Sequence, residues 1–373
     1  MKKVLFPLSL ALLGGACRAQ PGPAAPDSVD LDTMIGQMIL VGFRGTEVTE
    51  GDPVYSDIVD RKVGGIILFE YDVPSRSRPR NIASPEQVRR LVSTLQGWSG
   101  TPLFAAIDQE GGRVDRLKER YGFPASVSAA WLGSVNREDT TRAYSSRTAS
   151  LLAGLGLNVN FAPVVDVDLN PENPIIGAIE RSFSPDPAVV AANAAWFIEE
   201  HRKCGVAAVL KHFPGHGSSK GDTHLGLVDV TDTWRMSELV PYKQLIDDGL
   251  VDGVMTAHVV HRGLDPSGIS STLSNLVING LLRDSLGFNG VVFSDDLQMG
   301  AIRDHYELEE VVLHAIQAGV DVLTFGNNTV YEPDISARAI EAIRGLIAGG
   351  EVTRERIEVS YSRIMELKSR LTH

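Results

Sequence analysis

Five ionisable side chains fall within fourteen positions of the stretch VAAVLKHFPGHGSSKGDTH, which runs from residue 206 to residue 224. They are Lys211, His212, His216, Asp222 and His224. A short apolar run that leads into a loop rich in glycine, proline and serine is typical of a buried parallel strand followed by a functional loop. Burying these groups without partners would be costly or would shift their pKa values, so packing explains them poorly. A histidine and a carboxylate in such a loop could exchange protons near neutral pH, and the alternative is a solvated polar loop.

Polar side chains also follow four other apolar runs of the chain. These side chains are Asp108, Gln109, Glu110, Asp166, Asp168, His258, Asp295 and Asp296. A single polar strand end is often only a helix cap, but five strand ends in succession predict one converging site. Within this set we expect Asp296 to bond a loop backbone, and we expect His216 to pack inside its glycine-rich turn.

The elements that must position these residues are eight short apolar runs separated by longer amphipathic stretches. The runs cover residues 38–43, 65–69, 103–107, 159–167, 206–210, 253–257, 291–293 and 320–325. The stretches between them have helical features, for example Ser274 as the cap of a helix that stops at Gly287. Apolar strands that alternate with helices predict a parallel sheet covered on both faces. We therefore predict an α/β fold, a (β/α)₈ TIM barrel that forms a single catalytic domain over residues 31–373, with a doubly wound open sheet as the alternative.

Composition and charge are those of a globular protein with an acidic surface. Apolar residues make up 43% of the 373 residues, charged residues make up 22%, and the net charge is -12. The negative charge disfavours binding to nucleic acid, so we expect no nucleic-acid partner. Beyond the N-terminal region Cys204 is the one remaining cysteine, so the fold must rest on its hydrophobic core.

The first residues, MKKVLFPLSLALLGGAC, indicate export. Two lysines precede an apolar stretch that is too short to span a bilayer, and small residues stand directly before Cys17. This pattern resembles a bacterial lipoprotein cleavage site, although the usual leucine stands one place early, at Leu13. We expect a signal peptide over residues 1–17, lipidation of Cys17, and a Pro/Ala-rich tether over residues 18–30. The protein would then be periplasmic or at the cell surface, anchored to a bacterial membrane, with simple secretion as the alternative.

Several motifs together resemble those of glycoside hydrolase family 3, in its bacterial β-N-acetylglucosaminidase branch. In chain order they are DQEGGRV (108–114), NFAPVVDVD (160–168), RSFS (181–184), KHFPGHG (211–217), DTH (222–224), MTAH (255–258) and SDDLQM (294–299). They occur in the order typical of the family, and the resemblance extends from about residue 31 to the end of the chain.

The resemblance implies Asp295 as the catalytic nucleophile and His224 as the acid/base, with Asp222 orienting the histidine. It implies that the sugar is bound by Asp108, Arg116, Arg181, Lys211 and His212. These roles suit a retaining glycosidase, which needs one group to attack the anomeric carbon and another to protonate the leaving oxygen. The alternatives are that the lysine and His212 only brace the loop, and that Arg116 lies on the surface. Three residues separate Gly177 from Arg181, two more than is usual in the family, so this arginine could be presented differently.

By this resemblance we expect a retaining exo-β-N-acetylglucosaminidase, an O-glycosyl hydrolase of the β-N-acetylhexosaminidase type. It would remove terminal β-linked N-acetylhexosamine from cell-wall or chitin-like saccharides, for instance in peptidoglycan turnover. We expect a monomer that needs no cofactor or metal and that meets the membrane only through a lipid anchor. Three alternatives remain: a phosphorylase of the same family, a metal-dependent barrel hydrolase, and a non-catalytic sugar-binding lipoprotein.

Overall fold

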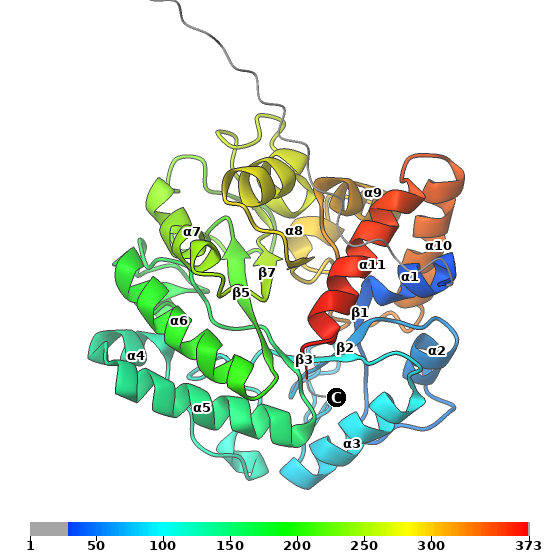
Figure 1. Cartoon of the computed structure of the whole chain (residues 1–373), viewed down its shortest axis with the longest axis horizontal. Helices are drawn as coiled ribbons and strands as arrows, with labels where there is room; N and C mark the ends of the chain where they lie inside the picture. The colour runs from blue at the N-terminus through cyan, green and yellow to red at the C-terminus, as the bar shows by residue number, and fades with distance from the viewer. Residues whose placement is uncertain (1–28, 372–373) are drawn as a thin grey trace, which may run out of the picture.

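The computed structural model describes residues 29–371, and Figure 1 shows the course of the chain. The predicted signal peptide, the predicted lipidation site Cys17 and all but the last two residues of the predicted tether lie outside the described residues. Regular structure begins at the expected place, because Asp30 caps a helix that starts at Leu31.

Eight parallel strands form one barrel-shaped sheet. Their order is β10-β1-β2-β3-β4-β5-β7-β9, and a parallel bridge between Phe293 and Val322 joins its two ends. The strands are β1 (Ile39–Gly42), β2 (Gly65–Leu68), β3 (Phe104–Ile107), β4 (Val159–Asn160), β5 (Ala207–Phe213), β7 (Gly253–Thr256), β9 (Val291–Phe293) and β10 (Leu323–Phe325). The predicted (β/α)₈ barrel is confirmed, and the open doubly wound sheet is wrong.

Two strands differ from the predicted runs. β4 has two residues where nine were expected, because Pro163 has no N–H to donate and the pairing resumes only as a bridge between Val164 and Lys211. β5 is longer than expected and carries Lys211 and His212 within the strand rather than after it. Both ionisable side chains therefore stand on a rigid element at the mouth of the barrel.

Helices surround the strands (Figure 1). The α-helices are α1 (Leu31–Gln37), α2 (Pro53–Val59), α3 (Pro85–Trp98), α4 (Ala129–Val135), α5 (Glu138–Leu155), α6 (Pro187–Lys203), α7 (Val240–Asp247), α8 (Gly300–Arg303), α9 (Leu308–Ala318), α10 (Ile335–Ala348) and α11 (Arg354–Lys368). A π-helical segment, η5 (Leu276–Ser285), begins one residue later than a Ser274 cap implies, with Asn275 before its first residue, and the Ser274 hydroxyl accepts from the Val277 N–H at 3.2 Å. No helix within residues 29–371 is both long and apolar enough to span a bilayer.

Short elements near the mouth of the barrel were not predicted. Four 3₁₀ turns are η1 (Glu119–Tyr121), η2 (Gly177–Ile179), η3 (Met236–Leu239) and η4 (Ser271–Leu273). A separate pair of two-residue strands joins β6 (Val228–Asp229) to β8 (Val259–Val260). Such elements carry too few residues to show a hydrophobic period, so sequence patterning does not detect them.

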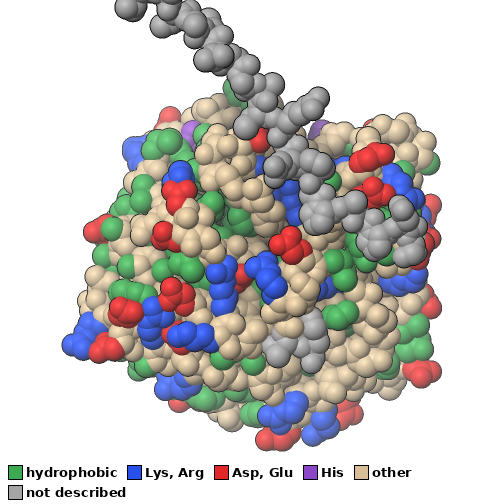
Figure 2. Space-filling model, in the orientation of Figure 1, with side chains coloured by type: hydrophobic (Ala, Val, Ile, Leu, Met, Phe, Trp, Pro, Cys, Tyr) green, Lys and Arg blue, Asp and Glu red, His purple; other side chains and the backbone are tan. Residues whose placement is uncertain are grey.

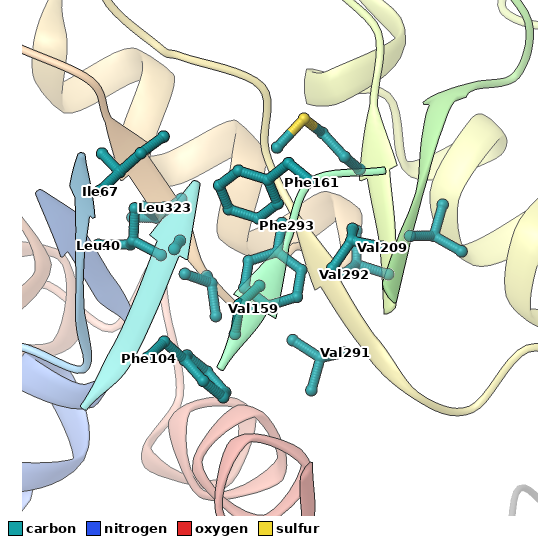
Figure 3. Packing of buried hydrophobic residues seen from close by; sticks show 14 of the residues in the cluster. Leu40, Ile67, Phe104, Val159, Phe161, Val209, Val291, Val292, Phe293 and Leu323 are labelled. Carbon is teal, nitrogen blue, oxygen red and sulfur yellow. The ribbon is translucent and has the colours of Figure 1, made fainter. Parts of the chain in front are cut away.

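The interior of the barrel is filled by apolar side chains. The ring of Phe293 lies 5.7 Å from that of Phe104 and 5.5 Å from that of Phe161, between centroids. Figure 3 shows these rings packed among aliphatic side chains such as Leu40 and Val209 from other strands. Because the barrel is a packed core rather than a pore, ligands can bind only at its ends. On the outer face shown in Figure 2, Lys and Arg side chains are interspersed with Asp and Glu side chains.

Candidate active site

One cavity of about 490 Å³ opens at the carboxyl ends of the barrel strands. Its lining includes all eight residues expected to act in catalysis or sugar binding, namely Asp108, Arg116, Arg181, Lys211, His212, Asp222, His224 and Asp295. They come from the ends of β3, β5 and β9 and from the loops after β3, β4 and β5, so segments almost 190 positions apart meet in one place. The structure thus brings together every residue predicted to act in catalysis or sugar binding.

Asp295 follows β9 and is a partly buried carboxylate. Its Oδ1 accepts a hydrogen bond from the Asp296 N–H at 2.8 Å. Burial would raise the pKa of Asp295, but the nearby His258, His212 and His224 more than offset burial and hold the pKa below its usual value. The side chain is therefore ionised at neutral pH, as an attacking carboxylate must be.

The neighbouring carboxyl of Asp296 faces the backbone instead. Its Oδ1 accepts from the N–H groups of Gln298 at 3.0 Å and Gly326 at 2.9 Å. Burial raises the pKa of Asp296 above its usual value. The expectation that Asp296 bonds a loop backbone is confirmed.

Asp222 and His224 form a hydrogen-bonded pair in the loop after β5. The carboxylate Oδ1 of Asp222 lies 2.7 Å from Nδ1 of His224 and also accepts the backbone N–H of His224 at 2.8 Å. Burial would lower the pKa of His224, but the bond to Asp222 and the charge of Asp295 raise it overall. Because Asp222 engages Nδ1, proton exchange with another group would use Nε2.

A charged network also lines the cavity. The Nζ of Lys211 lies 2.8 Å from an Asp108 oxygen and 2.7 Å from a Glu110 oxygen. Arg181 binds both oxygens of Glu110 at 2.8 Å, and Arg116 reaches Asp108 at 3.2 Å. Burial would raise the pKa of Glu110, but the charges of Arg181 and Lys211 lower it to about 2. The pKa of Asp108 is lowered in the same way, against burial, by Lys211 and Arg116.

His212 is held between a carboxylate and a cation. Its Nδ1 lies 2.7 Å from Asp166, and Arg181 donates to its Nε2 at 3.2 Å. Because an arginine can only donate, the proton of a neutral His212 must lie on Nδ1, toward Asp166. The imidazole is thereby fixed in orientation at the cavity wall.

His216 is buried and keeps the turn in place. Its Nδ1 lies 2.7 Å from the Ser219 hydroxyl, and burial lowers its pKa to about 4. A neutral, buried and bonded histidine matches the expected packing role, although the side chain also borders the cavity.

Two carboxylates of the site had no role assigned from the sequence. Glu110 joins Lys211 to Arg181, and Asp166 orients His212 and accepts the His216 N–H at 2.7 Å. Their place after β3 and β4 was the available signal, but their partners lie far along the chain. Only the fold shows that their charges are matched.

The longer loop before Arg181 does not remove this residue from the site. The extra residues form η2 (Gly177–Ile179), which ends at Glu180 in a left-handed conformation. The guanidinium of Arg181 also donates to the Ile175 carbonyl at 2.8 Å. Its side chain is 10% exposed and points to Glu110 and His212.

No group of three or more histidine, cysteine, aspartate or glutamate side chains in residues 29–371 is arranged to hold a metal ion. The arrangement does offer an ionised carboxylate, a histidine with a raised pKa and a polar wall suited to hydroxyl groups.

Comparisons with known proteins agree with this geometry. The family model "Glycosyl hydrolase family 3 N terminal domain" matches residues 30–367. The chain is 30% identical to "Beta-hexosaminidase A" of Pseudoalteromonas piscicida, over 93% of this chain and 62% of that protein. It is 36% identical to the "Beta-hexosaminidase" of Xylella fastidiosa (strain 9a5c), over 83% of this chain and 87% of that protein.

Among solved structures, a glycoside hydrolase family 3 β-N-acetylglucosaminidase from Paenibacillus sp. str. FPU-7 is similar, with a TM-score of 0.84 and 35% identity. The match covers 92% of this chain and 63% of that protein. The chain thus spans less than two thirds of the Pseudoalteromonas and Paenibacillus proteins but most of the Xylella protein.

Proposed function

This chain belongs to glycosyl hydrolase family 3, and from that premise we propose that it is a retaining exo-β-N-acetylglucosaminidase. It removes terminal β-linked N-acetylhexosamine from cell-wall or chitin-like saccharides. Support comes from the relatives, which carry the names β-hexosaminidase and β-N-acetylglucosaminidase. The observation that carries the proposal is that ionised Asp295 and the Asp222–His224 pair border the same cavity.

In the first step a carboxylate oxygen of Asp295 bonds to the anomeric carbon while the glycosidic C–O bond breaks. The leaving oxygen takes the proton from Nε2 of the His224 imidazolium, which leaves a neutral ring protonated on Nδ1 and hydrogen-bonded to Asp222. In the second step Nε2 accepts a proton from water, and the water oxygen bonds to the anomeric carbon as the ester to Asp295 breaks. Two inversions give net retention. The lowered pKa of Asp295 and the raised pKa of His224 suit these starting protonation states.

The sugar hydroxyls are bound by the charged network that lines the cavity. Asp108 accepts hydrogen bonds, whereas Arg116, Arg181 and Lys211 donate them, and His212 lines the same cavity. Charged partners form stronger hydrogen bonds to neutral hydroxyls than neutral partners do. Because these side chains already hold one another at 2.7–3.2 Å, they are ordered before the sugar arrives.

The test is hydrolysis of a chromogenic β-N-acetylglucosaminide by the wild type, Asp295→Ala and His224→Ala. General acid/base groups contribute about 10²–10⁴-fold, so the His224 variant should lose at least about a hundredfold in rate. The Asp295 variant should lose more, since no covalent intermediate can form. Asp284→Ala and His305→Ala, at exposed positions, are the matched controls and should keep wild-type rates.

An inactive wild type would refute the substrate class. Full activity in either the Asp295 or the His224 variant would refute the mechanism. Release of a sugar phosphate rather than free sugar when inorganic phosphate is supplied would favour the phosphorylase alternative.

We also propose that the protein is exported and anchored to a bacterial membrane through a lipid on Cys17. The support is the sequence of residues 1–17 alone. Mass spectrometry of the mature N-terminus should show a diacylated cysteine, and Cys17→Ser should release the protein from the membrane fraction. An intact, unmodified Cys17 would refute the anchor.

A further inference from the structure

The loop between β5 and β6 has a buried part and an exposed part. Residues 214–219 are buried, whereas the segment from Lys220 to Leu227, which carries the Asp222–His224 pair, is exposed or half-buried apart from Thr223. The exposed part touches the barrel through the carbonyls of Thr223 and His224, which accept from Ala301 at 3.1 Å and Gly300 at 3.3 Å. The position of the pair therefore depends on how firmly the buried part is held.

Glu238, in η3, lies directly beneath the buried part. Its side chain is fully buried, and Oε2 accepts the Gly217 N–H at 3.0 Å. Its other oxygen accepts the Arg235 N–H at 3.4 Å. A Cβ atom on Gly215 would lie only 2.7 Å from both the Cβ and Oε2 of Glu238, so the loop backbone rests against this side chain.

Neighbouring contacts hold the same few residues. Asp166 accepts the N–H of His216 at 2.7 Å, one residue before the amide that Glu238 binds. The indole N–H of Trp234 donates to the Pro214 carbonyl at 3.1 Å. Two carboxylates thus bind consecutive loop amides from two different elements, the loop after β4 and η3.

We propose that Glu238 is a positioning residue that sets the placement of the Asp222–His224 pair by holding the Gly217 amide. The inference rests on the proposed function, because the pair is the proposed acid/base of that reaction. Glu238 does not line the cavity, so it acts through the loop and not on the substrate.

The Glu238 carboxyl also changes its protonation state near neutral pH. Burial, reinforced by the negative charge of Asp166, raises the pKa of Glu238 to about 7. The titratable groups that face it are Asp166 and the buried Tyr242, and Arg235 contributes its backbone N–H. When ionised, Glu238 accepts from both amides, whereas the protonated carboxyl has one oxygen occupied by its proton. The N–H bonds from Gly217 and Arg235 both lower this pKa, so they bind the ionised carboxylate more strongly than the protonated carboxyl, and activity should decline as Glu238 is protonated.

The experiment compares the wild type, Glu238→Gln and Glu238→Ala, with Glu341→Gln as control, since Glu341 is exposed and remote on α10. Gln keeps one acceptor oxygen but places an NH₂ group against the Arg235 N–H. We measure kcat and kcat/KM across pH for two aryl β-N-acetylglucosaminides, one with a good and one with a poor leaving group. A displaced acid/base matters most for the poor leaving group, which requires protonation.

We expect Glu238→Gln to lose the acidic limb near neutral pH and to lose roughly tenfold in kcat/KM for the poor leaving group at alkaline pH. The good leaving group should lose less than about threefold, and Glu238→Ala should show the same selectivity with larger losses. Equal losses for both leaving groups, or an unchanged pH profile in Glu238→Gln, would overturn the proposal. If Glu238→Ala does not fold, the isosteric Gln variant decides the question.

A second readout does not depend on activity. Lys220 is exposed beside the pair, so trypsin cleavage after Lys220 reports on loop opening. Cleavage should be faster in both Glu238 variants than in the wild type and unchanged in Glu341→Gln. Equal cleavage in all proteins overturns the role of Glu238 even if the enzyme is active. If the wild type is inactive but trypsin cleaves the Glu238 variants faster, the proposed function is refuted. Only the contact between Glu238 and the loop is then supported.

Discussion

Replacement of Lys211 by Met should destabilise the protein in a strongly pH-dependent way. The side chain is 3% exposed, and its ammonium lies between Asp108 and Glu110. Met has a similar length and no charge, so the substitution removes the charge with little change in packing. Glu110 would retain Arg181 as a partner, and Asp108 would retain the more distant Arg116.

The magnitude follows from the pKa of Glu110, which is lowered from 4.5 to about 2. A shift of that size corresponds to about 3 kcal/mol of stability at neutral pH, shared between Arg181 and Lys211. Asp108, whose pKa is also lowered, adds a contribution of the same sign. Removing one partner of a buried ion pair typically costs about 3–5 kcal/mol. We therefore expect Lys211→Met to lose about 3 kcal/mol at neutral pH.

The sign of the pH dependence is set by the lowered pKa. The contribution of Glu110 is fully present above its unfolded pKa of 4.5 and is lost as pH falls through its folded pKa of about 2. The stability difference between wild type and variant should therefore shrink as pH falls from about 5 toward 2.

Urea denaturation at several pH values measures this difference. Lys243→Met is the control, because Lys243 is half-exposed in a surface pair with Asp247 and should change stability by less than about 1 kcal/mol. A Lys211 variant as stable as the wild type at pH 7 would refute the reasoning. A deficit that stays constant down to pH 3 would also refute it, because the loss would then be one of packing and not of charge.

Two further predictions concern the loop and its acid/base pair. Asp222→Asn removes a charge that raises the pKa of His224. The basic limb of the pH profile of kcat/KM should therefore move to lower pH. A basic limb that stays in place would contradict the assignment of His224 as the acid. Gly217→Ala places a Cβ atom 1.8 Å from the Val167 carbonyl oxygen, so thermal unfolding should report a loss of about 2 kcal/mol or more and activity should fall. Gly97→Ala, in open space on α3, should instead be neutral or stabilising by up to about 1 kcal/mol. Equal effects of the two glycine substitutions would show that the close approach of Gly217 to the Val167 carbonyl is unimportant.

Much of the fold could be predicted because it depends on local patterns. Each barrel strand is a short run of apolar residues, and burial on both faces imposes that pattern wherever the strand lies in the sheet. Helix ends were similarly predictable where a side chain caps its own chain, as Ser274 does for the Val277 amide. The length of β4 could not be predicted in this way. Pro163 lacks an N–H, and whether that shortens the strand depends on which neighbouring strand the N–H would have bonded to.

The candidate site, like the fold, could be predicted only in part from the sequence. The types and spacing of Asp222, His224 and Asp295, together with the family resemblance, predicted the chemistry. The partners of these residues came only from the tertiary structure. Glu238 illustrates the limit, since nothing in MSELVPY marks this glutamate as buried, yet it lies fully buried beneath the loop.

The sequence by itself determined the barrel class, the family and the set of side chains able to do the chemistry, because apolar periodicity and contiguous motifs are local properties of the chain. Only the tertiary structure decided which charges meet. Lys211 and Asp108 are 103 positions apart, and Arg181 and Glu110 are 71 positions apart. Burial and charge pairing set each pKa, and both depend on which strand ends the closed sheet brings together.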